Sequence, residues 1–174
     1  MGLLPPFIGA LLFTAIQFLV LLFVVIATPI AQIESTINEL CFTFWGSKSV
    51  CSRLHYSAKG KGAFGNCRQR LNNMNGGAAF AIISIFTTLV ALIFGVLMIF
   101  RLTCAVILPL IFTCISIFTI FISWACVAGA YTIKMCGVKW SNLALVYGPG
   151  FKLMIAAWCL QIINVAVLVL ISFF

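Results

Sequence analysis

Acidic residues are almost missing from this chain: aspartate does not occur, and glutamate occurs only as Glu34 and Glu39. Histidine occurs once, as His55. General acid–base catalysis needs such groups in positioned sets. The chain also has no phosphate-binding loop and no nucleophile–base pair that its sequence would place together. It therefore offers no catalytic residue, no cofactor site and no small-molecule substrate site, and we expect that it is not an enzyme.

Charged residues of either sign are scarce. Only 7% of the 174 residues are charged, whereas 64% are hydrophobic. A soluble domain is typically about 45–50% apolar and about 25% charged. In a chain of this length much of any fold stays exposed, so this apolar surface does not fit inside a water-soluble core. The composition predicts an integral membrane protein.

Basic residues make up most of the charge and give the chain a formal net charge of +8. They lie between the apolar runs, and no module that reads a nucleic-acid groove accompanies them. This placement favours membrane lipids, other membrane proteins or a second copy of the chain as partners. We expect no nucleic-acid partner.

Four apolar runs are long enough to cross a bilayer, which takes about 20 residues per helix. We expect spans at residues 7–30, 78–100, 102–130 and 153–174. A Gly76-Gly77 break precedes the second span, and Pro109 predicts a kink or an early first turn in the third. The alternative for residues 7–30 is a cleaved signal peptide, but that run is too long and no basic region precedes it.

The connections between these runs are unequal. Residues 31–77 form a long polar loop 1, loop 2 is little more than Arg101, and residues 131–151 form a short loop 3. The pattern predicts an all-α membrane protein, a four-transmembrane-helix bundle that occupies residues 1–174 as a single membrane domain.

Loop 1 contains a local strand signal. The aromatic run Phe42–Trp45 favours a strand, and Gly46 ends it. The run also suits an apolar patch at the membrane interface, where Trp is enriched, and the two interpretations are compatible. Cys41 and Cys51 flank this segment ten positions apart. A hairpin brings them together, and a disulfide restrains the loop by about 2–4 kcal/mol if its compartment is oxidising.

This segment resembles the signature of the amastins, four-span surface proteins of kinetoplastid parasites with a claudin-like architecture. The matching positions are Cys41, Phe42, Thr43, Phe44, Trp45, Gly46, Lys48 and Cys51. Val50 departs, because the family prefers a polar or acidic residue there. Tetraspanins differ, since their long loop lies between spans three and four and carries a Cys-Cys-Gly motif that this chain lacks.

The resemblance implies a multi-pass protein of the plasma membrane or cell surface with cytosolic termini. Loops 1 and 3 are then extracellular, and loop 1 forms a small β-containing subdomain. Its implied role is membrane organisation or contact between parasite and host membranes. From the residues we expect Phe42, Phe44 and Trp45 as the apolar contact, with Lys48 and Arg53 as charge partners. The alternative is that these aromatics only build the core of the loop.

The distribution of basic residues opposes an extracellular location for loops 1 and 3. Loop 1 and loop 3 carry most of the Lys and Arg, and the positive-inside rule would place both loops in the cytosol. No Asn-x-Ser/Thr sequon exists that would mark an extracellular loop. We expect loop 1 outside, since a folded, disulfide-bonded domain translocates despite its charge.

The other cysteines allow further predictions. Cys67 and Cys136 lie in the two loops on the same side of the membrane, so a bridge between them is plausible, with two free thiols as the alternative. Cys104 follows Arg101 at the cytosolic face and is a palmitoylation candidate. A zinc site of loop 1 cysteines with His55 is disfavoured, because the spacings lack the usual close Cys pairs.

The spans themselves contain no charged residue away from their ends. Ion-coupled carriers commonly need such residues at mid-membrane. Gln17, Gln161 and Asn164 are expected to hydrogen-bond between helices. A channel or transporter subunit lined by these three residues is one alternative function. A structural subunit of a larger membrane complex is the other.

Overall fold

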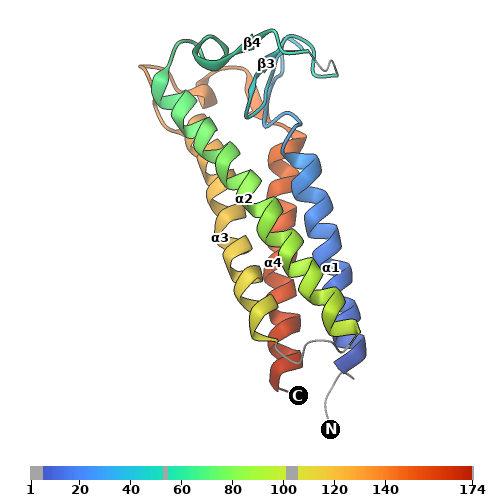
Figure 1. Ribbon diagram of the computed structural model, residues 1–174. Coiled ribbons are helices and arrows are strands. Elements are labelled where there is room, and N and C mark those ends of the chain that lie inside the picture. Colours follow the sequence, from blue (N-terminus) through green and yellow to red (C-terminus); the bar gives the residue numbers. More distant parts are fainter. Residues whose placement is uncertain (1–5, 53–54, 101–105, 174) are drawn as a thin grey trace.

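A computed structural model describes residues 6–52, 55–100 and 106–173 of the chain. Within these ranges four helices are long and apolar enough to cross a membrane: α1 (Pro6–Ala27), α2 (Arg68–Ile99), α3 (Ile107–Thr132) and α4 (Pro149–Phe173). Helix α2 packs along α3 and α1 along α4, and further α1–α2 and α3–α4 contacts complete the bundle (Figure 1). The expected four-helix fold class is confirmed.

The buried residues of each helix recur at spacings of three and four residues, the repeat of helices that pack at shallow left-handed angles. From Gly77 onward the buried face of α2 is made of small side chains: Gly77, Ala78, Ala81, Ser84, Thr88, Ala91 and Gly95. Small residues let helices approach closely in a bilayer, where contact between helices depends on packing and hydrogen bonds. The opposite faces are apolar and exposed, with Phe86 and Phe118 among the most exposed side chains, as lipid contact requires.

Helix α2 begins at Arg68, although the sequence predicted a span from Ala78 after a glycine break. Gly76 and Gly77 lie inside the helix. The Gly77 position needs glycine because a Cβ there would lie 2.7 Å from Phe44 Cε1 and 3.2 Å from the Ser123 carbonyl oxygen. At 32 residues the helix is roughly 48 Å long, whereas a hydrocarbon core is about 30 Å thick, so its first turns extend beyond the membrane.

The two prolines near the starts of α3 and α4 lie in first turns. Pro109 is the third residue of α3, and Pro149 is the first residue of α4. A proline in the first turn removes an N–H that has no helical partner anyway. The second of the two expectations for Pro109 is therefore the correct one, and α4 begins four residues before the expected Leu153.

A small antiparallel sheet lies at one end of the bundle, while α1 begins and α4 ends at the opposite end (Figure 1). The described residues form five short strands: β1 (Ile33–Ser35), β2 (Cys41–Phe42), β3 (Gly46–Lys48), β4 (Ala58–Lys59) and β5 (Leu145–Tyr147). Their order is β4-β3-β2-β1-β5. The predicted β-containing subdomain is confirmed, and the α3–α4 connection contributes its edge strand β5. Two 3-10 helices, η1 (Gly60–Phe64) and η2 (Trp140–Asn142), pack beside it.

Candidate functional site

The sheet, η1, η2 and the described residues that connect them, in the ranges 28–52, 55–67 and 133–148, form a unit that we call the loop subdomain. Its most constrained part is the β2–β3 turn. The Thr43 hydroxyl donates to the Gly46 carbonyl oxygen at 3.1 Å and accepts from the Trp45 N–H at 3.2 Å. A Cβ at Gly46 would overlap the Ala58 carbonyl oxygen on β4. Thr43 and Gly46 therefore serve to build this turn.

The β2–β3 turn packs against the helical bundle. Phe44, at its centre, is buried and packs on Gly77, which lies within the candidate span of α2. Trp45 follows it and is 42% exposed. A tryptophan with this placement suits the membrane–water interface, where its apolar ring and polar N–H are both accommodated.

Phe42 faces the core of the loop subdomain. Its ring centroid lies 4.5 Å from that of Trp140 and 6.3 Å from that of Phe64. Phe42 and Phe44 are both buried, whereas Trp45 is exposed. Burial favours the alternative in which the first two build the core of the loop, and it leaves Trp45 as the accessible member of the three.

Two disulfides hold the loop subdomain together. Cys41 on β2 bonds to Cys51, with 5.4 Å between their Cα atoms. Cys67, which precedes α2, bonds to Cys136 in the α3–α4 connection, with 5.8 Å between Cα atoms and 69 positions between them in sequence. The second bridge and the β1–β5 pairing join the two loops covalently and by hydrogen bonds.

Arg70 provides a third link between the loops, and sequence reasoning missed it. Its side chain is buried, and Nη2 donates to the carbonyl oxygens of Val138 at 3.0 Å and Met135 at 3.4 Å. Its guanidinium carbon lies 4.3 Å from the Trp140 ring centroid. In the sequence Arg70 looks like Arg68 two positions earlier, which is exposed, and no local signal separates them.

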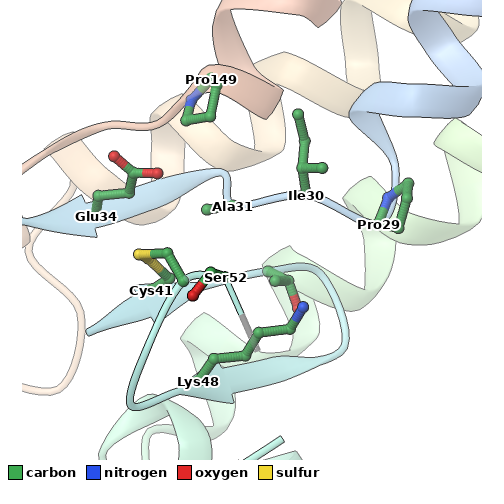
Figure 2. A pocket seen from close by; sticks show the side chains of 10 residues that line it. Pro29, Ile30, Ala31, Glu34, Cys41, Lys48, Ser52 and Pro149 are labelled. Atoms are coloured by element: carbon green, nitrogen blue, oxygen red, sulfur yellow. A yellow bond between two sulfur atoms is a disulfide. The ribbon is translucent and has the colours of Figure 1, made fainter. Parts of the chain in front are cut away.

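A pocket of about 490 Å³ opens beside the Cys41–Cys51 bridge (Figure 2). Its lining comes from the α1–β1 connection, the first three strands, the segment after β3 and the start of α4. Glu34 and Lys48 bring charges of opposite sign to it, and Thr43 and Ser52 bring hydroxyl groups. The sequence singled out Lys48 as a family position but did not associate it with Glu34.

A metal site in this region has no free thiolate to use. The Glu34 carboxylate and the sulfur atoms of Cys41 and Cys51 lie within 4.8 Å of one another, but both sulfurs belong to the disulfide. Cys67 is also bonded, so the zinc alternative with His55 lacks all three of its cysteine ligands. His55 is exposed. Arg53 and the palmitoylation candidate Cys104 lie outside the described residues.

Buried carboxamides connect three helices inside the bundle. Asn164 Nδ2 on α4 donates to Gln17 Oε1 on α1 at 2.7 Å, and Gln17 Nε2 donates to the Thr88 carbonyl oxygen on α2 at 3.2 Å. Gln161 is equally buried, and neither atom of its amide has a partner among the residues described. These contacts match the interhelical hydrogen bonds expected for Gln17 and Asn164, but Gln161 makes none.

Comparison with known proteins identifies the family. No curated protein and no solved structure matches the chain. The family described as "Amastin surface glycoprotein" matches residues 18–168, which covers most of the chain and includes the whole loop subdomain. Four candidate spans and a disulfide-bonded first loop agree with the resemblance noted at the Cys41–Cys51 segment. The chain belongs to the amastin surface glycoprotein family.

Proposed function

We propose that this amastin acts at the cell surface, where its loop subdomain organises membranes or holds an apposed membrane in contact. The observation that carries the proposal is the attachment of the subdomain to the bundle. A disulfide, a strand pairing and the Arg70 hydrogen bonds join the two loops across 65 or more positions of sequence. A surface that is ordered before binding loses less conformational entropy when it binds.

The distal end of the subdomain supports the contact role. The β1–β2 turn lies at the strand ends opposite the Thr43–Trp45 turn, because antiparallel strands place successive turns at alternate ends. It carries Ile37, which is 76% exposed. A large apolar side chain so exposed, at the end farther from the bundle, suits insertion into another surface.

The charge of the subdomain favours an anionic surface as the partner. Exposed cations on its described part are Lys59, Lys61, Lys134 and Lys139, and Arg68 follows it at the start of α2. The acidic side chains there are Glu34 and Glu39. Each Lys or Arg near an anionic lipid surface contributes about 1 kcal/mol of attraction.

The proposed orientation places loops 1 and 3 outside and the termini in the cytosol. Disulfides persist in oxidising compartments, which supports this side for Cys41–Cys51 and Cys67–Cys136. The positive-inside count opposes it. Thiol labelling of Cys51 in intact cells tests the choice, because we expect an impermeant maleimide to label it only after reductant is added. Labelling that needs permeabilised cells would reverse the orientation.

Vesicle capture tests the contact role. Full-length protein reconstituted in one vesicle population is mixed with acceptor vesicles of anionic or of neutral lipid. We expect capture of the anionic acceptors, and less capture by Ile37→Ser and by the double variant Lys59→Gln/Lys61→Gln. Lys152→Gln is the matched control, because Lys152 is exposed on the first turn of α4 and lies outside the subdomain. Equal capture by every variant would contradict the proposal.

A further inference from the structure

The pocket beside the Cys41–Cys51 bridge has a regular charge arrangement. In the sheet register Glu34 on β1 lies opposite Cys41 on β2, and Cys41 lies opposite Lys48 on β3. The three residues form one row across the sheet, and directly opposed residues share a face. A carboxylate and an ammonium therefore flank the disulfide from two sides, and all three side chains line the pocket (Figure 2).

Glu34 and Lys48 do not neutralise each other. Their strands are separated by β2, which sets the backbones roughly 9–10 Å apart. Among the described residues, the Glu34 carboxylate has no hydrogen-bond or ion-pair partner. Lys48 has a cation–π contact, with Nζ 5.1 Å from the Tyr56 ring centroid. The pocket thus presents one positive and one negative group held apart by a covalent bridge, an arrangement complementary to a zwitterion.

The pocket lies beside the ends of two candidate spans, which is where lipid headgroups would lie if these spans cross a bilayer. Pro29 and Ile30 in its wall follow the last residue of the α1 candidate span, and Pro149, also in the wall, begins the α4 candidate span. Val25 and Ile26, in the last turn of α1, are exposed apolar side chains on the way to this wall. A headgroup in the pocket would leave its acyl chains free to follow the helices into the bilayer.

The lining also discriminates between headgroups. Its residues are Pro29, Ile30, Ala31, Glu34, Cys41, Thr43, Lys48, Cys51, Ser52 and Pro149, without an aromatic ring. Quaternary ammonium groups are recognised by aromatic cages, whereas a primary ammonium donates hydrogen bonds that a carboxylate accepts. An anionic headgroup without an amine would leave Glu34 unpaired beside a second negative charge. The volume, about 490 Å³, lies within the usual range for small-ligand sites.

We infer that this pocket binds the phosphoethanolamine headgroup of a phospholipid in the protein's own membrane, with Lys48 at the phosphate and Glu34 at the ammonium. The site is distinct from the distal end proposed for membrane contact. It requires only that the candidate spans lie in a bilayer, so it stands or fails independently of the contact role.

Binding to purified full-length protein in detergent tests the inference. The probes are a short-chain phosphatidylethanolamine, the matched phosphatidylcholine and phosphatidylglycerol, and free phosphoethanolamine. We expect the phosphatidylethanolamine to bind about tenfold more tightly than the other two lipids, since one charged hydrogen bond separates them. Equal affinity for the three lipids would overturn the site. Equal affinity for free phosphoethanolamine and the lipid would overturn the lipid assignment in favour of a soluble zwitterion.

Variants locate the binding groups. Glu34→Gln should weaken phosphatidylethanolamine binding about tenfold and abolish the preference over phosphatidylglycerol, and Lys48→Met should weaken both lipids. The controls are Glu39→Gln, the other glutamate, and Lys59→Met, whose ammonium makes the same kind of contact with Tyr56 at 5.3 Å but does not line the pocket. Unchanged binding by Glu34→Gln overturns the inference. A variant that fails to form its disulfides gives no information about the pocket. In that case the lipid preference of the unmodified protein decides the inference. If the unmodified protein binds phosphatidylethanolamine selectively but captures no acceptor vesicles, only the contact role is refuted.

Discussion

The Arg70 guanidinium lies against the face of the Trp140 ring, with 4.3 Å between Cζ and the ring centroid. These residues are 70 positions apart, since Arg70 lies in the first turn of α2 and Trp140 lies in η2 of the α3–α4 connection. Arg70 also donates to two carbonyl oxygens of the α3–α4 connection. One buried cation therefore fixes the position of loop 3 over the start of α2.

Replacing Arg70 by Met should destabilise the loop subdomain by about 2–4 kcal/mol. The variant loses charge-assisted hydrogen bonds to two carbonyl oxygens and a cation–π contact of a buried guanidinium. Thermal unfolding in detergent, followed through Trp fluorescence, measures the change. Arg68→Met is the control, because Arg68 is exposed. A melting temperature equal for the two variants would show that Arg70 adds no stability.

Removing the Cys67–Cys136 bridge should cost more stability than removing Cys41–Cys51. The first closes a segment of 69 positions and the second one of ten. The loss of entropy of the unfolded chain then contributes about 4 kcal/mol of stability for the first bridge and about 3 kcal/mol for the second. The first value is an upper bound, because α2 and α3 stay inserted in the membrane and already restrict the unfolded chain. Double serine variants of each pair, compared by thermal unfolding without reductant, test the order. Peptide mapping under non-reducing conditions checks the pairing itself, which an alkylatable Cys67 or Cys136 would contradict.

Gly77→Ala should destabilise the junction between the β2–β3 turn and the bundle by about 1–3 kcal/mol. The added methyl group would lie 2.7 Å from Phe44 Cε1 and 3.2 Å from a backbone oxygen on α3, so the packing must shift. Gly76→Ala is the matched control, since the nearest atom to its Cβ is Cys126 Sγ at 3.8 Å. We expect Gly76→Ala to be neutral or slightly stabilising, because alanine favours a helix more than glycine does. A larger loss of stability for Gly76→Ala than for Gly77→Ala would refute the close packing of Phe44 on Gly77.

Replacing the buried carboxamides Asn164 and Gln161 should change the free energy of unfolding in different ways. Asn164→Leu removes the 2.7 Å bond to Gln17 and should cost about 0.5–2 kcal/mol. Gln161→Leu should be neutral or stabilising, because burying an amide without partners is unfavourable. Unfolding of both variants in the same detergent compares them. A large loss of stability for Gln161→Leu would show that its amide has a partner, such as water, and would support the channel alternative.

The aromatic run of the amastin signature shows which structural features the local sequence predicts and which it does not. The strand propensity of Phe42 and the turn at Gly46 are local properties, and they predicted the hairpin and the cysteine pair that flanks it. Burial is not local. Phe42 packs on Trp140, Phe44 packs on Gly77, and Trp45 stays exposed, although all three are large aromatics adjacent or nearly adjacent in sequence.

The sequence by itself determined the membrane environment, the four spans and the disulfide-bonded hairpin, because the length of an apolar run and a short-range pairing depend only on residues close together in the chain. Tertiary structure decided the rest. The edge strand β5, the Arg70 link and the opposed charges of Glu34 and Lys48 depend on register between segments that meet only after the helices pack. The glycine pair that the sequence predicted as a break lies inside α2, and Gly77 permits close packing there, since glycine serves close packing as readily as a turn.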